Sequence, residues 1–294
     1  MTDKILFGII GGSGLYGFEG LENKQTIEID TPFGKPSSPI VIGEVKGHKL
    51  AFLARHGIGH IYSPSDVNYR ANIYAFKSLG IRAIVSVSAV GSLREDYAPG
   101  HIIVPDQIYD NTKGRERSFF GEGMVVHVST ADPFCPCLSQ FLLQALRDQG
   151  AIVHEGGTLV TIEGPRFSTR GESETFRKWG MSLVGMTAAP EAFLAREAEM
   201  CYATMAHVTD YDCWHVSEEA VTVDMVISTL SKNTATAQKS LVRLVELLDK
   251  AHNEGMACYC DCENALKYAF ITNPDYIYEA KKQALKLLTE KYFD

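Results

Sequence analysis

Ile5-Leu-Phe-Gly-Ile-Ile-Gly-Gly-Ser-Gly14 is the stretch of sequence that decides the fold. A continuous apolar run that ends in glycines is typical of a buried strand leading into a tight turn. Apolar runs recur at residues 50–54, 83–90 and 202–208, and segments with helical spacing lie between them. Apolar strands that alternate with helices predict an α/β fold, in which a mainly parallel sheet is covered on both faces.

The remaining elements are predicted from apolar spacing and from capping residues. Ser65 is expected to cap a helix that runs to about Leu79, where Gly80 ends it. Further strands are expected at residues 26–30, 39–45, 101–104, 158–163 and 183–186, and helices at 136–149, 172–179, 190–199 and 218–250. Because no linker rich in Pro, Gly or Ser divides residues 1–294, we expect a single domain with a helical tail from about residue 254.

Composition excludes several classes of function. The formal net charge is −8, and acidic and basic residues are interspersed, so no broad positive surface is expected for nucleic acid or an anionic membrane. No apolar run approaches the roughly 18 residues that a membrane span requires, and the first residues lack the pattern of a signal peptide. We therefore expect a cytoplasmic protein without nucleic-acid or membrane partners, and mostly reduced cysteines.

The glycine turn has two possible readings. Gly12-Ser-Gly14-Leu-Tyr-Gly17 matches the dinucleotide pattern G-x-G-x-x-G, but that motif needs a crossover helix, and residues 18–24 are too short and poorly patterned for one. A glycine turn with inward N–H groups can instead hold a single phosphate, helped by the Ser13 hydroxyl. The sequence therefore favours a phosphate site over a nicotinamide site.

Two other strand ends carry residues suited to an anion. Arg55 and His56 follow the apolar run 50–54 and place a guanidinium and an imidazole where ligands of α/β proteins usually sit. Ser88-Ala-Val-Gly-Ser92 ends another buried strand with small residues that allow close approach of a ligand. A structural ion pair of Arg55 and a simple strand-to-loop turn at Ser88 remain the alternatives.

Nine motifs in chain order carry a resemblance to a known family. They are Gly8-Ile-Ile-Gly-Gly-Ser-Gly-Leu15, Asp30-Thr-Pro-Phe-Gly-Lys-Pro36, Leu53-Ala-Arg-His-Gly57, Ser65-Asp-Val-Asn-Tyr-Arg-Ala-Asn-Ile73, Ala89-Val-Gly-Ser-Leu-Arg-Glu95, Ala131-Asp-Pro-Phe-Cys-Pro136, Thr161-Ile-Glu-Gly-Pro-Arg-Phe-Ser168, Gly185-Met-Thr187 and Thr209-Asp-Tyr-Asp-Cys-Trp214. Through these motifs, over about 200 residues, the chain resembles the trimeric class of purine nucleoside phosphorylases, most closely its methylthioadenosine branch.

The resemblance implies the nucleoside phosphorylase fold, a mixed central sheet flanked by helices, assembled as a homotrimer or as a hexamer of two trimers. It implies phosphate as co-substrate, no metal and no organic cofactor. It implies these site residues: Ser13, Arg55, His56, Ser88, Ala89 and Thr187 for phosphate, Met186 for ribose, Phe167 for the base, His60, Pro64, Val223 and Val226 for the 5′ substituent, and His127 donated from a neighbouring subunit.

The segment Thr209-Asp210-Tyr-Asp212 indicates the base and its chemistry. A buried carboxyl beside a purine has a raised pKa, so it can stay protonated and serve N7 as an acid. Relatives that prefer adenine have both acidic residues, and Ser168 after Phe167 argues the same way; we therefore expect Asp210, Asp212 and Ser168 to act in catalysis on an adenine nucleoside. A 6-oxopurine phosphorylase and a noncatalytic nucleoside-binding protein remain alternatives.

The cysteines form an unusual local cluster. Cys258-Tyr-Cys260-Asp-Cys262 lies in the tail, which matches the vertebrate relatives poorly, and Cys135-Pro-Cys137 lies earlier in the chain. Zinc sites usually separate paired cysteines by two to four residues, so C-x-C-x-C alone is a poor tetrahedral framework. Reduced thiols, a disulfide and a metal site remain alternatives, in that order.

Overall fold

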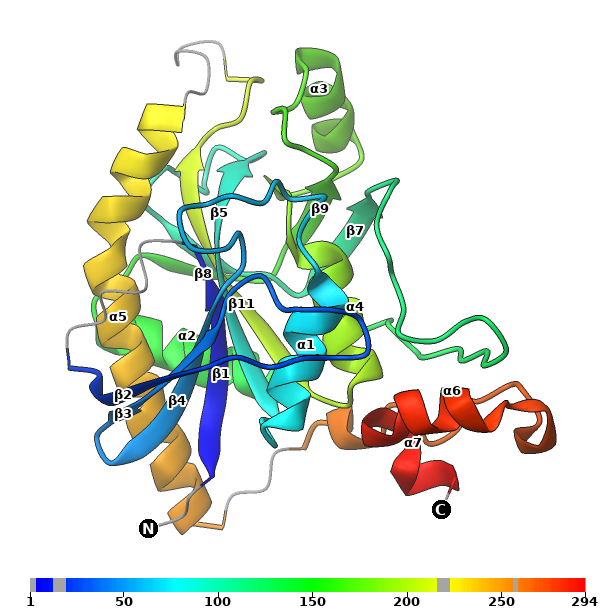
Figure 1. Ribbon diagram of the computed structural model, residues 1–294. Coiled ribbons are helices and arrows are strands. Elements are labelled where there is room, and N and C mark those ends of the chain that lie inside the picture. The colour runs from blue at the N-terminus through cyan, green and yellow to red at the C-terminus, as the bar shows by residue number, and fades with distance from the viewer. Residues whose placement is uncertain (1–3, 13–19, 216–222, 256–258, 294) are drawn as a thin grey trace.

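One mixed sheet forms the centre of the computed structural model, which describes residues 4–12, 20–215, 223–255 and 259–293 (Figure 1). The described strands are β1 (Ile5–Gly11), β2 (Glu22–Ile27), β3 (Ile40–Val45), β4 (His48–Ala54), β5 (Ala83–Ser92), β6 (Ile102–Val104), β7 (Gln107–Asn111), β8 (Val153–Glu155), β9 (Thr158–Ile162), β10 (Leu183–Gly185) and β11 (Cys201–Asp210). They run in the order β2-β3-β4-β1-β5-β10-β9-β7, and β11 links β5 to β6 and β8. Six of the ten pairings between these strands are parallel. The expected mixed, mainly parallel sheet is confirmed.

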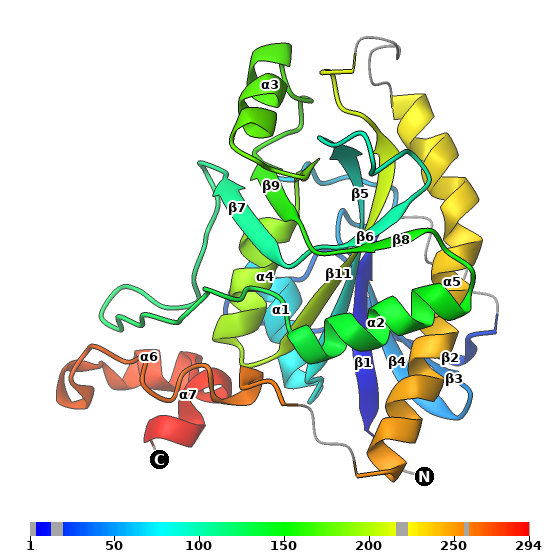
Figure 2. The ribbon, with the colours of Figure 1, turned by 180° about the vertical axis from the view of Figure 1, so that it is seen from behind.

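Helices cover both faces of the sheet. They are α1 (Tyr69–Ser78), α2 (Pro136–Asp148), α3 (Arg170–Lys178), α4 (Ala188–Glu197), α5 (Val223–Asn253), α6 (Glu279–Ala284) and α7 (Lys286–Phe293), with 3-10 turns at Cys262–Asn264 and Pro274–Tyr276. Leucines of α2 and α5 share one apolar cluster with the strands, whereas α1 and α4 share another on the opposite face (Figures 1 and 2). Among the described residues, none of the helices has both the length and the apolar composition of a membrane-spanning helix.

The C-terminal segment packs beside α1 and α4 (Figure 1). Buried Leu266 and Leu288 belong to the same apolar cluster as these helices. The backbone of the segment also pairs with a loop, because the His127 N–H donates to the Ala269 carbonyl at 2.8 Å and Val126 bridges Phe270. The expected helical tail is therefore folded onto the body of the protein.

One prediction about local structure is wrong, and two strands were missed. The cap of α1 is Asn68, whose side chain accepts from the Ala71 N–H at 3.1 Å, because the Ser65 hydroxyl is used by Glu163 at 2.5 Å instead. The strands β7 and β8 were not expected. Both are short and only partly buried, so they lack the apolar run by which buried strands are found in a sequence.

A gap in the pairing of β5 positions the functional site. On one side β5 pairs with β11 from Ala83 to Gly91. On the other side β1 pairs with it up to Ser86, and β10 pairs with it only from Gly91 onward. Residues 87–90 therefore have no described strand on that side, next to the carboxyl end of β1. In α/β sheets, ligands usually bind at such a change in strand order.

Helix α1 packs so closely against strand β1 that position 8 of the strand has to be a glycine. A Cβ placed on Gly8 of β1 would lie 2.6 Å from Cε2 of the buried Phe76 ring in α1. We expect Gly8→Ala to lower the free energy of unfolding by about 1–3 kcal/mol, as overpacking does, measured by urea denaturation. Gly171→Ala in α3 is the control. Its Cβ would meet nothing closer than 4.0 Å, so it should leave stability unchanged or raise it. Equal midpoints for the two variants would contradict this account of α1 packing.

Candidate functional site

A cavity of about 440 Å³ opens beside the unpaired stretch of β5. Twelve residues predicted from the sequence line it: Arg55, His56, His60, Pro64, Ser88, Ala89, Phe167, Ser168, Met186, Thr187, Asp210 and Asp212. Ser13 and the side chains of Val223 and Val226 lie outside the described residues. His127 is exposed and does not line the cavity of its own chain. These twelve predicted residues thus share one cavity, and their individual roles stay predictions.

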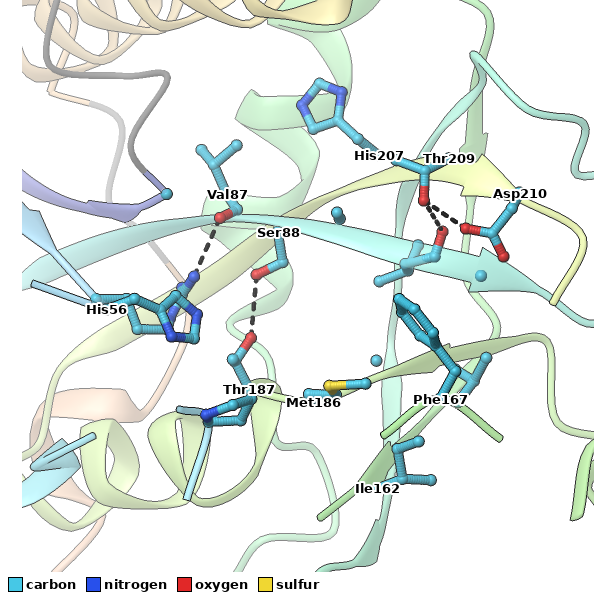
Figure 3. Close-up of a pocket in the computed structure, with 18 of the residues that line it drawn as sticks. His56, Val87, Ser88, Ile162, Phe167, Met186, Thr187, His207, Thr209 and Asp210 are labelled. Carbon is cyan, nitrogen blue, oxygen red and sulfur yellow. Dashed lines mark hydrogen bonds between the residues drawn. The ribbon is translucent and has the colours of Figure 1, made fainter. Parts of the chain in front are cut away.

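The lining of the cavity differs between its two ends (Figure 3). Ser88, Thr187 and His56 lie at one end, whereas Phe167 and Asp210 lie at the other, with Met186 between them. Apolar side chains of Val90, Ile162 and Val184 complete the wall. This arrangement suits a ligand with an anionic group at one end and a flat, polar-edged ring at the other.

Arg55 is held by a buried ion pair whose partner, Glu191, the sequence did not reveal. Its Nε and one terminal nitrogen donate to Glu191 Oε2 and Oε1 at 2.7 and 2.9 Å, and both side chains are almost fully buried. Burial works against its charge, but the Glu191 carboxylate more than offsets this and raises the pKa of Arg55, so the guanidinium stays charged. The structural ion pair considered for Arg55 is present, and Arg55 nevertheless lines the cavity.

One edge of the guanidinium remains available for an anion. The terminal nitrogen shared with Glu191 also donates to Ser86 Oγ at 2.7 Å, and the other terminal nitrogen donates to the Val87 carbonyl at 3.2 Å. That other nitrogen carries two N–H groups, so one of them has no acceptor among the described residues. Because Glu191 neutralises the charge of Arg55, a bound phosphate also needs neutral donors. The hydroxyls of Ser88 and Thr187, 3.3 Å apart, can supply them.

His56 is a neutral imidazole rather than a second cation. Its Nδ1 lies 3.0 Å from the Tyr62 carbonyl and must donate to it, since a carbonyl only accepts. Burial and the neighbouring Arg55 lower the pKa of His56 to about 4. At neutral pH its Nε2 is therefore an acceptor, suited to a protonated phosphate oxygen.

Asp210 reaches the cavity through an irregularity in β11. The register with β5 shifts between Val208 and Asp210, which lets the neighbours Thr209 and Asp210 both line the cavity although consecutive strand residues normally face opposite sides. Gly91 makes room for this, since a Cβ there would lie 3.0 Å from Asp210 Oδ1. A backbone distortion thus aims the carboxyl at the cavity.

Burial raises the pKa of Asp210, against hydrogen bonds from Thr209 and from the Asp212 N–H. The Thr209 hydroxyl lies 2.7 Å from Asp210 Oδ2 and 3.3 Å from the Val90 carbonyl. It can donate to the carboxylate, or donate to Val90 and accept from the protonated acid. Thr209 therefore satisfies both protonation states of Asp210, as a residue that gives and regains a proton requires.

Asp212 is the second buried carboxyl of the site. Its Oδ2 has no hydrogen-bond partner in the part of the chain that the structure describes, and neither has the Ser168 hydroxyl. Burial raises the pKa of Asp212, while the nearby hydroxyls of Ser173 and Ser168 lower it, although neither reaches hydrogen-bonding geometry. An unpaired acceptor in a cavity wall points to a donor on the ligand.

Arg115 was missed by the sequence analysis because it lies far from the motif that it supports. It donates to the Met186 carbonyl at 2.6 Å and to the Ala189 carbonyl at 2.8 Å, which fixes the turn between β10 and α4. With its carbonyl so occupied, Met186 can offer its N–H to a ligand. No local pattern marks Arg115, since even its partner nearest in the sequence, Tyr69, is 46 residues away.

His207 is a second residue that sequence reasoning missed. It lines the cavity from β11 and points away from Met186 and Phe167 (Figure 3). Its side chain is 1% exposed, and neither ring nitrogen has a hydrogen-bond partner among the described residues. Burial lowers the pKa of His207 to about 4, so the ring is neutral in the folded protein above that pH.

Comparisons with known proteins show what the chain is similar to. Residues 6–246 match the family described as the phosphorylase superfamily. The chain is 53% identical to the S-methyl-5′-thioadenosine phosphorylase of Chloroflexus aurantiacus over 287 aligned residues. The alignment covers 97% of this chain and 98% of the relative.

Two solved structures give the same result. A methylthioadenosine phosphorylase sourced from an Antarctic soil metagenomic library matches with a TM-score of 0.90 at 46% identity, covering 98% of this chain and 99% of that chain. The methylthioadenosine phosphorylase from Schistosoma mansoni, in complex with adenine, matches with a TM-score of 0.81 at 41% identity, covering 84% and 93%.

The buried His207 makes stability depend on pH. Because its pKa is about 4 in the folded protein and 6.5 in the reference state, the unfolded chain binds more protons between these values, so folding weakens as pH falls. His207→Met removes this contribution. Relative to the parent, the variant should gain about 2 kcal/mol of unfolding free energy between pH 7 and pH 5, measured by urea denaturation at both values. A constant difference between the two proteins would show that His207 is not held neutral.

Proposed function

The chain belongs to the phosphorylase superfamily and, within it, to the methylthioadenosine phosphorylases, and we propose that it cleaves 5′-methylthioadenosine with inorganic phosphate. The resemblance seen in the nine motifs is thereby confirmed. The products would be adenine and 5-methylthioribose 1-phosphate, which makes the protein a pentosyltransferase of purine and methionine salvage. The observation that carries the proposal is the shared cavity with Arg55 at one end and Asp210 at the other.

The reaction begins with the departure of the base. As the bond between C1′ and N9 breaks, positive charge develops on the ribosyl group, and the phosphate next to it stabilises that charge before bonding to C1′. The free edge of Arg55, the hydroxyls of Ser88 and Thr187, the backbone at Ala89 and the Ser13 turn hold the phosphate. His56 accepts from its protonated oxygen.

Asp210 supplies the proton that the leaving base needs. In its protonated form it donates to N7, so adenine leaves as a neutral molecule rather than an anion. The phosphate loses its own proton when one oxygen bonds to C1′, and that proton restores Asp210. As Asp210 loses and regains its proton, the Thr209 hydroxyl switches its donated hydrogen bond between Asp210 and the Val90 carbonyl. No organic cofactor enters this sequence of steps.

The second carboxyl explains a preference for adenine. The unpaired Oδ2 of Asp212 is an acceptor, and the 6-amino group of adenine is a donor, whereas a 6-oxo group would face it with a second acceptor. Met186 lies between the two ends and Phe167 lies at the end of Asp210, where the ribose and the base would pack. A 6-oxopurine nucleoside is therefore the poorer substrate.

Assembly completes the site in this proposal. His127 is exposed and does not line the cavity of its own chain, and in this proposal it contacts the 5′ substituent bound in a neighbouring subunit. Ile58 and Ile61, next to His60 at the cavity, are each 70% exposed, as interface residues would be in an isolated chain. We propose a cytoplasmic homotrimer, in which His60, Pro64, Val223 and Val226 also face the methylthio group.

A direct assay tests the proposed reaction. The protein is incubated with methylthioadenosine, with and without phosphate, and free adenine is measured by chromatography. We expect adenine only with phosphate, in equal amount to the sugar 1-phosphate, and slower cleavage of inosine. Adenine release without phosphate would instead indicate a hydrolase, and faster cleavage of inosine would indicate a 6-oxopurine enzyme.

Asp210→Asn tests the acid. Loss of the donated proton should lower kcat for methylthioadenosine by about 10²–10⁴-fold, with a smaller loss for inosine. Because burial raises the pKa of Asp210, kcat of the parent should fall as pH rises through that pKa, and the variant should lose this limb. Asp96→Asn, which removes an exposed partner of Arg94, is the control and should keep parent activity. An unchanged kcat in Asp210→Asn would remove Asp210 from the acid role.

A further inference from the structure

Four cysteines from distant parts of the chain meet in the structure. The Sγ atoms of Cys135, Cys201, Cys260 and Cys262 all lie within 4.8 Å of one another. Cys258, the first residue of the C-x-C-x-C motif, lies outside the described residues. The C-x-C-x-C motif by itself is a poor framework for a metal. In the folded protein, however, Cys135 and Cys201 lie beside Cys260 and Cys262, although they are distant in the sequence.

The geometry points to a tetrathiolate site, and we propose that these four cysteines bind one zinc ion. Four sulfurs about 2.3 Å from a central zinc ion in a tetrahedron lie roughly 3.8 Å apart, which fits the observed spacing. Clusters of several irons hold their thiolates farther apart, so the spacing favours a single ion. Soft thiolate ligands in tetrahedral array are the preferred environment of zinc.

A disulfide fits these positions less well. The sulfurs of Cys201 and Cys260 are 3.4 Å apart, whereas a disulfide bond measures about 2.05 Å. One disulfide would also leave two further sulfurs crowded against it without a role. A metal ion uses all four sulfurs at once.

Backbone hydrogen bonds hold two of the four cysteines in place. The Cys135 N–H donates to the Tyr202 carbonyl at 2.8 Å, and the Cys201 N–H donates to the Arg82 carbonyl at 2.8 Å. Cys135 and Cys262 are 2% and 3% exposed, so half of the site is shielded from water. Structural zinc sites bind four protein ligands and keep no open position for water, which fits a shielded group of four cysteines.

Neighbouring groups offset the negative charge of the site. Zinc with four thiolates carries a net charge of −2. A terminal N–H of Arg196 donates to Cys262 Sγ at 3.3 Å, and the Leu138 N–H donates to Cys135 Sγ at 3.4 Å at the N-terminus of α2, where the helix dipole favours a thiolate. Such second contacts orient the ligands of a metal. Binding releases the thiol protons to solvent and involves no oxidation or reduction.

The site would tie the C-terminal segment to the body of the protein. Cys260 and Cys262 begin this segment, while Cys135 precedes α2 and Cys201 begins β11, as the neighbouring ends in Figure 2 show. Asp210 is at the other end of β11, about 30 Å away at 3.3 Å per residue. The role of the ion is therefore structural, and the inference does not depend on the proposed activity.

Metal analysis of the purified protein tests the proposal. The full chain is purified from cytosol without chelator, passed through a gel-filtration column, and analysed by mass spectrometry for zinc and iron. We expect about one zinc per chain. Cys201→Ser and Cys260→Ser should each retain less than about a tenth of it. Cys137→Ser, two residues from Cys135 and outside the group, is the matched control and should keep the zinc. Zinc retained equally by all variants, iron in its place, or no metal would overturn the proposal.

Three further measurements keep the test open if the variants do not fold. Thiol titration of the unfolded parent, without reductant and after chelation, should give all seven cysteines; five or three would mean disulfides and overturn the zinc site. Replacing the ion with cobalt(II) should produce the strong visible bands of tetrahedral thiolate coordination, and their absence would have the same meaning. Chelation under denaturant-free conditions should lower Tm by at least about 5 °C. An unchanged Tm would remove the structural role.

Discussion

The buried pair of Arg55 and Glu191 is the interaction on which the rest of the site depends. Arg55 leaves the end of β4, and Glu191 lies in the first turn of α4, so the pair joins the sheet to the helix that follows β10. Removing two charges from water is costly unless every donor and acceptor is used. The additional bonds from Arg55 to Ser86 and to the carbonyls of Ile10 and Val87 use all of its donors but one, the N–H that remains available for an anion.

This pair and the gap in β5 act together. The carbonyl of Val87 belongs to the stretch that has no described strand beside it, and Arg55 occupies that side in place of a strand. The strand pairing can therefore be interrupted at this point while the buried Val87 carbonyl keeps a hydrogen-bond partner. A guanidinium edge is brought into the cavity as a consequence. The same interaction that closes the break in the sheet thus prepares a place for an anion.

The sequence could predict what local pattern determines. Strands β1, β5 and β11 were found because fully buried strands consist of continuous apolar residues, and most of the site was found because it follows their ends. Partners joined only by folding could not be found. Glu191 lies 136 residues from Arg55, and the sulfurs of Cys135 and Cys201 meet those of the tail from separate segments. Such pairs leave no spacing in one chain by which they could be recognised.

Strand β11 shows why stability and chemistry can be separated in this fold. At its carboxyl end, a shift in register and the buried carboxyls of Asp210 and Asp212 lower stability, because buried acidic groups and an unpaired oxygen are costly. At its first residue, Cys201, the strand is held by its pairing with β5, by the Tyr202 carbonyl and by the cysteine group. A strand anchored at one end can tolerate strain at the other. The well-held Cys201 end of β11 therefore compensates for the destabilising residues at the Asp210 end.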